Sequence, residues 1–377
     1  MRIGIEAQRI FRKNKHGMDY VVLEEIRELQ RTDKTNEYFI YVKPGEDECL
    51  HETERVHIRL LQCPSYPLWE QVALPMAARH DKVQLLHCTS NTAPIVSTGV
   101  PLILTLHDII FLEKRDKRNK SLYQNLGWMY RRAVVPRVLR RCRKIITVSD
   151  FERNNIINTL ALPADRIVRI YNGYNEWFCP DSTSGEAYKR YIDAPGYFFF
   201  LGNTDPKKNT ERTLAAYAKY IAGSMVRRKL LVADLSAEHI REMLRRQGVE
   251  DIAPYIVAPG YIVNADLPDI YRGAFAFLYT SLRESFGIPL LEAMACGVPV
   301  ITSSTSSMPE IAGGAGAFID PESPESIAAM MLRLEDDTDY YADRRAAGIE
   351  RVKLFSWKRT AAELLRLYEK TAGEGEQ

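Results

Sequence analysis

Short, nearly continuous apolar runs alternate along the chain with longer segments in which apolar positions recur at helical spacing. Each short run predicts a buried strand, and each periodic segment predicts a helix with one apolar face. The expected strands cover residues 2–7, 37–42, 56–61, 83–88, 100–106, 144–148, 166–171, 197–201, 229–234, 255–258, 274–280 and 299–302. The expected helices cover residues 18–30, 69–80, 151–160, 210–221, 237–247, 267–272, 288–296, 325–335 and 357–371. Strands joined by crossover helices predict an α/β protein with parallel sheets.

The segment 274–310 is the most informative, because a strand, a turn, a helix and a strand follow one another there. Ser285 is the predicted N-cap of the helix, and Pro289 lies in its first turn, where a missing N–H costs little. The free N–H groups and the helix dipole make this turn a predicted phosphate site. Its donors belong to Phe286, Gly287 and Ile288, and Gly287 also lets the backbone approach a ligand closely.

Two carboxylates flank this turn, at Glu284 and Glu292. A carboxylate is a poor ligand for phosphate but a good acceptor for sugar hydroxyls, so the combination suggests a nucleotide sugar. The alternative interpretation is that both glutamates are solvated residues near a helix end, with Glu284 favoured by the dipole.

A long stretch in this region resembles the signature of the retaining glycosyltransferases of family 4, and in particular the mannosyltransferase-like bacterial group 1 enzymes. It reads Arg283-Glu-Ser-Phe-Gly-Ile-Pro-Leu-Leu-Glu-Ala-Met-Ala-Cys-Gly-Val-Pro-Val-Ile301, and Met308-Pro-Glu310 and Gly313-Gly314 follow it. The resemblance implies the GT-B fold, in which two Rossmann-like domains have parallel sheets facing a central cleft. It also implies that the C-terminal helix crosses back to the first domain.

The chain length of 377 residues fits two domains of ordinary size. A turn signal at Asn172-Gly173 opens a stretch rich in Pro, Asp, Ser and Gly, which is typical of a linker between domains. We expect an N-terminal, acceptor-side domain at residues 1–175, joined by the terminal helix at about 357–371. A C-terminal domain that binds the nucleotide sugar is expected at residues 176–356.

Two lysines, Lys207 and Lys208, precede the predicted helix 210–221, where the helix dipole disfavours cations. They make sense if an anion binds there, although two solvated lysines are the alternative. In the resembled family a basic residue of this loop binds the donor diphosphate, and Lys208 matches it best. Family members commonly have an arginine after the loop glycine, Gly202, but this chain has Asn203, so part of the usual phosphate clamp is missing.

The resemblance assigns further roles in the second domain. It implies that Glu284 binds hydroxyls of the donor sugar and that Glu292 binds the ribose. It also implies that backbone groups around Tyr261 and Ile262 lie against the nucleotide base.

In the first domain, a Gly-x-Gly-x-x-Gly sequence is absent after the first strand, which argues against a dehydrogenase. The resemblance implies that Gly17 faces the donor phosphates, whereas the alternative is that it only permits a turn. His107 follows a predicted parallel strand, at the edge of the sheet where ligands bind. A structural histidine is the alternative, but in the resembled family a histidine at this place contacts the donor sugar.

Net charge, cysteine spacing and the lack of long apolar runs exclude several classes of protein. A net charge of +2 gives no bulk argument for nucleic acid, and the six cysteines are scattered, which argues against a disulfide framework or a zinc site. Residues 1–6 predict a strand rather than a signal peptide, and no apolar run of about 18 residues predicts a spanning helix. We therefore expect a cytoplasmic protein. Asp337-Thr-Asp339 matches a metal motif of another fold and is interpreted as a chance acidic turn.

The most basic stretch, 114–144, interleaves Lys and Arg with aromatic and apolar residues. It could lie on the anionic inner face of a membrane, bind an acidic or lipid-diphosphate acceptor, or be an ordinary surface helix.

The resemblance implies a retaining hexosyltransferase, which we expect to be metal-independent and to need no cofactor. It would move a sugar from GDP-mannose or a UDP-sugar to a glycan or a lipid-linked glycan during synthesis of cell-surface polysaccharide. Two alternatives are another GT-B enzyme, such as a nucleotide-sugar 2-epimerase, and a non-catalytic nucleotide-sugar binding protein, which Asn203 favours.

Overall fold

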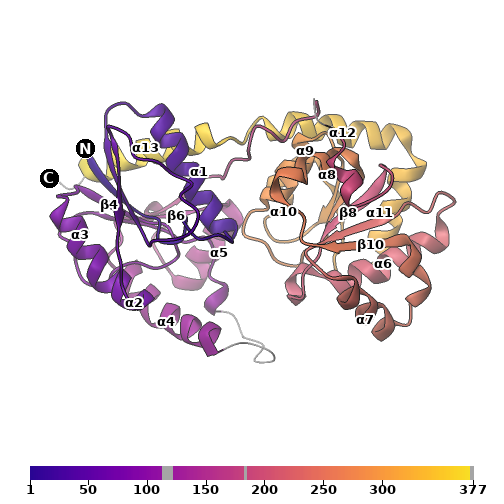
Figure 1. Ribbon diagram of the computed structural model, residues 1–377, viewed down its shortest axis with the longest axis horizontal. Coiled ribbons are helices and arrows are strands. Elements are labelled where there is room, and N and C mark those ends of the chain that lie inside the picture. The colour runs from indigo at the N-terminus through magenta and orange to yellow at the C-terminus, as the bar shows by residue number, and fades with distance from the viewer. Residues whose placement is uncertain (113–121, 182–184, 374–377) are drawn as a thin grey trace. The chain divides into compact units, whose positions relative to one another are not determined.

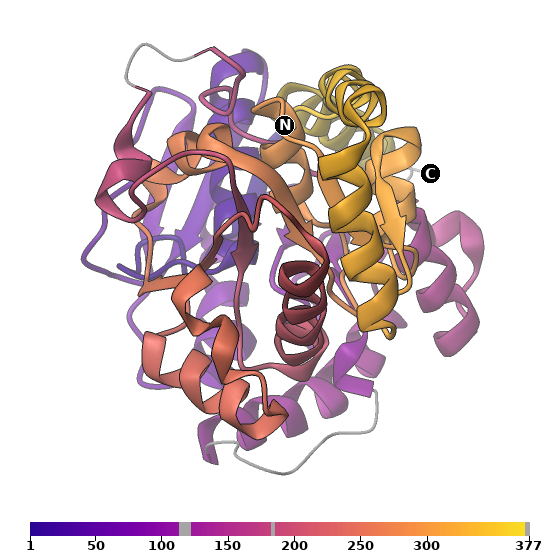
Figure 2. The same ribbon diagram turned by 90° about the vertical axis from the view of Figure 1, so that its right-hand side faces the viewer.

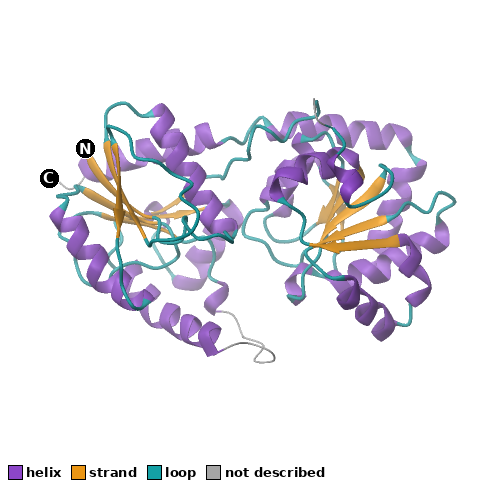
Figure 3. Cartoon of the chain, viewed as in Figure 1, coloured by secondary structure: helices purple, strands orange, loops and turns teal. Residues whose placement is uncertain are grey.

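The computed structural model describes residues 1–112, 122–181 and 185–373. The chain divides into two compact units, which we call the first and the second domain. The first domain comprises Met1–Asn172 together with Trp357–Gln377, and the second comprises Gly173–Ser356. Each contains one parallel sheet with helices on both faces (Figure 3), which confirms the predicted α/β class.

The first domain has a seven-stranded sheet in the order β3-β2-β1-β4-β5-β6-β7, and every neighbouring pair is parallel. Its strands are β1 (Arg2–Glu6), β2 (Glu37–Val42), β3 (Val56–Leu60), β4 (Leu85–Cys88), β5 (Leu102–Thr105), β6 (Lys144–Thr147) and β7 (Ile167–Arg169). Its helices include α1 (Gly17–Thr32), α2 (Tyr66–Leu68), the π-helix η1 (Trp69–Ala73), α3 (Leu74–His80), α4 (Leu122–Leu139), α5 (Asp150–Leu160) and α13 (Trp357–Gly373).

The second domain has a six-stranded parallel sheet in the order β10-β9-β8-β11-β12-β13. Figure 1 labels two of these strands, β8 and β10. Its strands are β8 (Tyr197–Leu201), β9 (Leu230–Ala233), β10 (Ile256–Gly260), β11 (Ala274–Tyr279), β12 (Val300–Ser303) and β13 (Ala317–Ile319). Its helices include α6 (Thr210–Gly223), α7 (Ala237–Gln247), α8 (Leu267–Gly273), α9 (Ile288–Ala295), α10 (Met308–Ala312), α11 (Pro324–Asp336) and α12 (Thr338–Val352). Helices α6 and α11 lie side by side on one face (Figure 2).

The predicted strands and helices are present, with ends that differ by a few residues. The last strand, β13, and the helices α10 and α12 were not predicted. Strand β13 is only Ala317-Phe-Ile319, too short a run to stand out, and α12 buries little more than Gly348 and Val352, so its sequence carries little apolar periodicity. Asp337 caps α12, because its side chain accepts a hydrogen bond from the N–H of Tyr340. The acidic turn is therefore a helix cap.

The C-terminal helix α13 belongs to the first domain, as predicted, and packs against α1. Its Tyr368 is fully buried, and the hydroxyl lies 2.7 Å from Nδ1 of His87 on β4. The other ring nitrogen of His87 lies 2.7 Å from the hydroxyl of Thr105 on β5. Burial lowers the pKa of His87 to about 3, so the ring is neutral and pairs with both hydroxyls. This buried polar chain fixes α13 to the sheet.

We predict that Tyr368→Phe lowers the free energy of unfolding by about 1–3 kcal/mol, because it leaves a ring nitrogen of His87 buried without its partner. Urea unfolding measures this effect. Tyr340→Phe is the matched control, since its ring stacks on Arg333 and the ring is retained. Equal stability of the two variants would contradict a role for the His87–Tyr368 bond in anchoring α13.

Candidate active site

The loops that follow β8 and β11 meet at the carboxyl edge of the second sheet. These two strands are neighbours, so their loops leave the sheet side by side. The buried side chain of Asn209 connects them: its Nδ2 donates to the carbonyl of Thr280 at 3.0 Å and to the carbonyl of Pro321 at 2.7 Å. The N–H of Leu282 also donates to the carbonyl of Lys207 at 2.7 Å. The two loops therefore form one rigid ledge.

Asn209 also stands before α6, as predicted, but its side chain does not cap that helix. The residue adopts a left-handed backbone with φ 62°, and its carboxamide is turned towards the neighbouring strand ends instead. The side-chain amide of Asn209 thus bonds the loops after β11 and β13 rather than the N-terminus of α6. These hydrogen bonds allow a polar side chain to be buried here.

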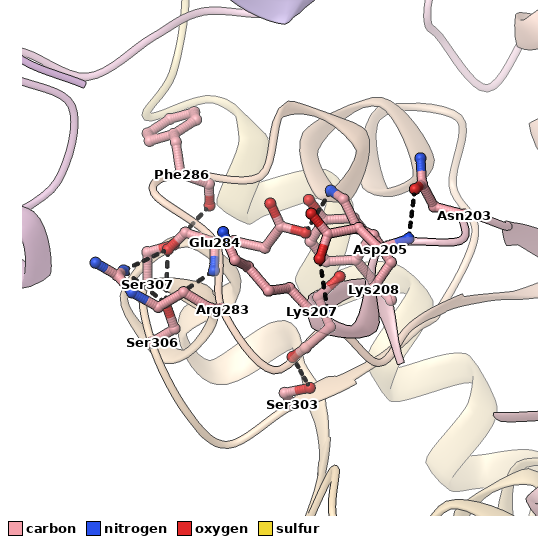
Figure 4. A network of polar contacts seen from close by, with 12 residues as sticks. Asn203, Asp205, Lys207, Lys208, Arg283, Glu284, Phe286, Ser303, Ser306 and Ser307 are labelled. Carbon is pink, nitrogen blue, oxygen red and sulfur yellow. Dashed lines mark hydrogen bonds and ion pairs between the residues drawn. The ribbon is translucent and has the colours of Figure 1, made fainter. Parts of the chain in front are cut away.

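The ion pair between Lys208 and Glu284 is the centre of the ledge (Figure 4). Nζ of Lys208 lies 2.7 Å from Oε1 of Glu284, and the two side chains are 36% and 14% exposed. Nζ also lies 5.9 Å from the centre of the Tyr279 ring. Burial and the Glu284 carboxylate together raise the pKa of Tyr279 well above its usual value, so its hydroxyl stays protonated. One cation and one carboxylate are thus presented together at the end of β11.

The helix α9 begins at Ile288, as the sequence predicts, but its cap differs from the prediction. Its N-cap is Gly287, with φ 107°, and not Ser285, which lies in the loop before it. The reason is the following loop, whose hydroxyls hold the backbone of residues 284–286 outside the helix. The left-handed conformation at Gly287 then turns the chain into the helix, a step that a residue with a side chain takes only with strain. Phe286 is buried, and Ile288 is the first residue of α9.

A serine-rich loop after β12 is hydrogen-bonded to the backbone of Glu284 (Figure 4). The hydroxyl of Ser306 donates to the Glu284 carbonyl at 2.6 Å and accepts from its N–H at 3.0 Å. Ser307 donates to the same carbonyl at 3.0 Å and to that of Phe286 at 3.1 Å. The Arg283 side chain lies 3.3 Å from the Ser306 hydroxyl. Both backbone groups of Glu284 are therefore fixed. The sequence analysis did not assign Ser306 or Ser307 to the site, although both lie in a segment rich in Ser and Thr.

Glu292 lies one turn into α9 and is only partly exposed. Its Oε2 accepts a hydrogen bond from the hydroxyl of Tyr271 on α8, at 3.2 Å. Burial raises the pKa of Glu292 to about 7, because little else compensates the charge there. A ligand that donates hydroxyls to this carboxylate would favour its charged form.

The loop after β8 has a tight glycine and an engaged asparagine. A Cβ on Gly202 would lie 2.7 Å from Cδ1 of Leu235, so only glycine fits without a shift. The side chain of Asn203 accepts a hydrogen bond from the N–H of Asp205 at 2.8 Å. The hydroxyl of Thr210 donates to the backbone carbonyl of Asn203 at 2.6 Å. Asn203 therefore shapes the loop and does not replace the guanidinium that the family pattern has there. Lys207 is half-buried within the same turn.

The residues after β10 lie at the same edge of the sheet, two strands away from β8 on the side opposite β11. Tyr261 is 68% exposed, whereas Ile262 is buried, and Gly260 before them has φ 84°. The carbonyl of Gly260 accepts from the N–H of Asp234 at 2.8 Å, which holds the turn. The exposed ring of Tyr261 offers a ligand a flat surface, and the fixed backbone beside it offers hydrogen-bonding groups.

The other two predicted site residues belong to the first domain. Gly17 is the first residue of α1, its φ is not positive, and a Cβ on it would meet nothing within 4 Å. The fold therefore does not require glycine there. Beside it, the buried Asp19 accepts from the N–H of His16 at 2.8 Å and pairs with Arg9 and Arg12.

His107 is buried just after β5, and both its backbone and its ring are fixed. Its N–H donates to Oδ1 of Asn91 at 2.7 Å, and Nε2 lies 3.1 Å from the carbonyl of Thr89. A carbonyl only accepts, so Nε2 carries the proton and Nδ1 is the acceptor. Glu6 in turn accepts from the N–H of Thr89 at 3.1 Å. Burial lowers the pKa of His107, which keeps the ring neutral.

Two predictions concern other parts of the chain. The basic stretch 114–144 lies partly outside the described residues, and its described part is mostly the helix α4. Among the helices that the structure describes, none is both long and apolar enough to cross a bilayer.

Comparisons with known proteins match both domains. Residues 189–351 match the family model of the glycosyl transferases group 1, and residues 16–177 match that of glycosyltransferase family 4. The O-antigen chain mannosyltransferase B of Escherichia coli is 33% identical over 230 residues, which are 59% of this chain and 60% of that protein. The serotype-specific mannosyltransferase WbdA of Escherichia coli is 25% identical over 288 residues, 73% of this chain and 34% of that protein. The chain thus spans only part of these relatives.

Solved structures show the same fold. HepE from Anabaena, in a complex with UDP, superposes with a TM-score of 0.75 at 17% identity and covers 98% of this chain and 100% of its own. Sucrose-phosphate synthase from Thermosynechococcus elongatus gives 0.73 at 18% identity, covering 98% of each chain. At such identities the likeness shows the fold alone, and it confirms the predicted GT-B architecture.

We predict that Glu292→Gln makes the protein more stable at neutral and alkaline pH. The raised pKa means that wild-type stability falls as the pH rises from the ordinary value of 4.5 to about 7, because the folded state must then hold a buried carboxylate. The variant avoids this cost, so its free energy of unfolding should exceed that of the wild type by up to about 3 kcal/mol at pH 8. The difference should vanish below about pH 4.5, where the carboxyl is protonated.

Denaturant unfolding across this pH range measures the effect. Glu242→Gln, on the exposed side of α7, is the matched control and should show no such pH-dependent gain. A variant that is less stable than the wild type at pH 8 would contradict an uncompensated carboxylate at this position.

Proposed function

The chain belongs to the family 4 glycosyltransferases, and on this premise we propose that it is a retaining, metal-independent hexosyltransferase. It transfers a sugar from a nucleoside-diphosphate sugar to a glycan or a lipid-linked glycan in the synthesis of cell-surface polysaccharide. The donor is GDP-mannose or a UDP-sugar. Support for mannose comes from the mannosyltransferases among its relatives, and support for a uridine nucleotide comes from the UDP complex of HepE.

The observation that carries this proposal is the Lys208–Glu284 pair on the ledge before α9. The difficult step in glycosyl transfer is departure of the diphosphate, on which negative charge develops. Lys208 and the N–H groups of residues 286–288 would stabilise that charge without a metal ion. Since Lys208 is partly exposed, its ammonium can contact a phosphate oxygen while it still contacts Glu284.

The remaining residues fit the parts of such a donor. Glu284, whose backbone the serine loop fixes, would accept hydrogen bonds from hydroxyls of the sugar. Glu292 would bind the ribose, and the turn at Tyr261 and Ile262 would receive the base. In the first domain, Nδ1 of His107 is an acceptor for a sugar hydroxyl, and the small Gly17 leaves room for phosphates.

The configuration at the anomeric carbon would be retained, because the acceptor attacks from the same face that the leaving group departs from. The acceptor hydroxyl would form the new bond to the anomeric carbon, and the departing phosphate would take its proton. No second carboxylate is needed as a nucleophile, which distinguishes this chemistry from that of a retaining hydrolase.

We also propose that the protein works in the cytoplasm, where nucleotide sugars would reach it. Its six cysteines are all free, which fits a reducing compartment.

We predict that one nucleotide sugar stabilises the wild type without added metal, and that Glu292→Ala weakens this effect. A ligand at 100 times its dissociation constant should add about 2.7 kcal/mol to the free energy of unfolding. Thermal unfolding with a panel of GDP-, UDP- and ADP-sugars and the matching diphosphates measures it and identifies the base. Absence of stabilisation by every member of the panel, with or without magnesium, would contradict the donor site.

We predict that Lys208→Met lowers kcat by about 10²–10³-fold, because a charge that stabilises the leaving diphosphate is lost. Transfer of labelled sugar to an added glycan acceptor measures the rate. Lys219→Met, on the exposed side of α6, is the matched control. Epimerised donor without any acceptor would point to an epimerase instead, and donor binding without turnover on a broad panel of acceptors would point to a binding protein.

A further inference from the structure

The loop after β9 lies between the two parts of the candidate donor site in the second domain. In the sheet, β9 separates β8, which precedes the ledge, from β10, which precedes the turn at residues 260–262. The N–H of Gly202, after β8, donates to the carbonyl of Ala233 at 2.9 Å. The N–H of the next residue, Asp234, donates to the carbonyl of Gly260 at 2.8 Å. Asp234 is therefore fixed beside the turn to which we assign the nucleotide base.

The backbone conformation of Asp234 does not explain why an acidic residue is present. Its φ is 65°, in the left-handed region, which glycine enters without strain. Aspartate and asparagine tolerate this region better than other residues with a side chain, but neither is required by it. A glycine would therefore serve the turn equally well, and the carboxylate itself needs another explanation.

The carboxylate of Asp234 is exposed and has no partner in the part of the chain that the structure describes. The surrounding protein removes part of its hydration, and this raises the pKa of Asp234 because no donor or cation offsets the loss of water. Donors on a ligand would restore the missing interactions. The side chain thus has the properties of a free acceptor beside the candidate donor site.

Two other acidic side chains follow the turn, and both are engaged. Asp266 accepts a hydrogen bond from the Tyr191 hydroxyl at 2.8 Å and pairs with Arg190 at 3.0 Å. Asp269 forms an ion pair within α8. Both stabilise the protein around the turn, so of these three carboxylates only that of Asp234 is available to a ligand.

The turn itself presents a braced apolar surface. Tyr261 and Val263 are 68% and 50% exposed, whereas Ile262 between them is buried and anchors the turn. The carbonyl of Val263 accepts from the N–H of Asp266 at 2.9 Å, which closes the chain into the short helix η7 (Asn264–Asp266). A planar base that packs on such a surface presents its polar edge sideways, to groups on the neighbouring loops.

We propose that Asp234 reads the base of the nucleotide sugar and selects guanine, an inference that rests on the proposed function because it specifies the base in the same donor site. Guanine presents two adjacent donors on one edge, N1–H and the 2-amino group. A carboxylate accepts a hydrogen bond from each of them with its two oxygens. The donor is then a guanosine-diphosphate sugar.

The other common bases do not match a carboxylate in this way. Uracil presents one N–H between two carbonyl oxygens, and adenine presents an amino group beside a ring nitrogen that only accepts. Each offers the carboxylate one hydrogen bond and places a lone pair against its second oxygen. A partly desolvated carboxylate left in this state costs binding free energy, which is the physical basis of the selection.

The test is isothermal titration calorimetry of the full chain with GDP, IDP, UDP and ADP. We expect GDP to bind most tightly, and IDP, whose base lacks the 2-amino group, to bind at least about tenfold more weakly. Asp234→Gly keeps the left-handed backbone and should weaken GDP binding by about tenfold or more while UDP binding stays nearly unchanged. Glu238→Gln neutralises an exposed carboxylate on α7 and is the matched control, which should bind like the wild type.

An exchange of specificity tests the contact directly. In Asp234→Asn the carboxamide keeps one acceptor and gains one donor. It therefore complements xanthine, which has a carbonyl where guanine has the 2-amino group. The variant should prefer xanthosine diphosphate to GDP by about tenfold or more, the reverse of the wild type. A residue that only shapes the loop would not invert this preference.

Three results would overturn the inference: a wild type that prefers UDP or ADP, GDP binding by Asp234→Gly at wild-type strength, or an equal loss of all diphosphates in Asp234→Asn. The first of these would leave the proposed glycosyl transfer intact, because a donor still binds. Absence of binding by every diphosphate would instead remove the donor site, and the proposed function would fail together with the choice of base.

Discussion

The buried carboxamide of Asn209 is the contact on which the candidate site depends. Its two hydrogen bonds cross from the loop after β8 to the ends of β11 and β13, so three segments far apart in sequence are held at one point. The left-handed backbone of Asn209 brings Lys208 directly before it to the edge of the sheet. Without that lock, the distance between Lys208 and Glu284 would depend on the backbone bond from Leu282 to Lys207 and on two long side chains, which lose conformational entropy when they pair.

A second level of support acts on the backbone rather than on the side chains. The hydroxyls of Ser306 and Ser307 hold both polar backbone groups of Glu284 and the carbonyl of Phe286. These bonds keep the residues before α9 out of the helix. Hydroxyl groups that compete for backbone groups in this way explain why the N-cap is Gly287 and not Ser285.

The first domain reaches a comparable rigidity by burying neutral polar groups. His87 and His107 are both kept uncharged by burial, and each ring is fixed by a hydroxyl or carbonyl partner. For His87 the result is structural, since it anchors α13. For His107 the result is a defined acceptor nitrogen at the end of β5. Burial and hydrogen bonding thus give two histidines in one sheet different roles.

The sequence by itself determined most of the elements, the class and the family, because these depend on local patterns: apolar runs for strands, helical periodicity, and one long motif. It also placed the candidate residues of the second domain in loops directly after strands, and the carboxyl ends of these strands share one edge of the sheet. The pairing of Lys208 with Glu284, the position of the N-cap and the tautomer of His107 were decided only by tertiary structure. Each of them depends on partners from distant segments, such as Ser306 for Glu284 and Thr89 for His107. The helix formed by α2, η1 and α3 shows the same limit. Leu68, Val72 and Met76 have the spacing of a buried helix face but are exposed, because packing decides which face of a helix is left in water.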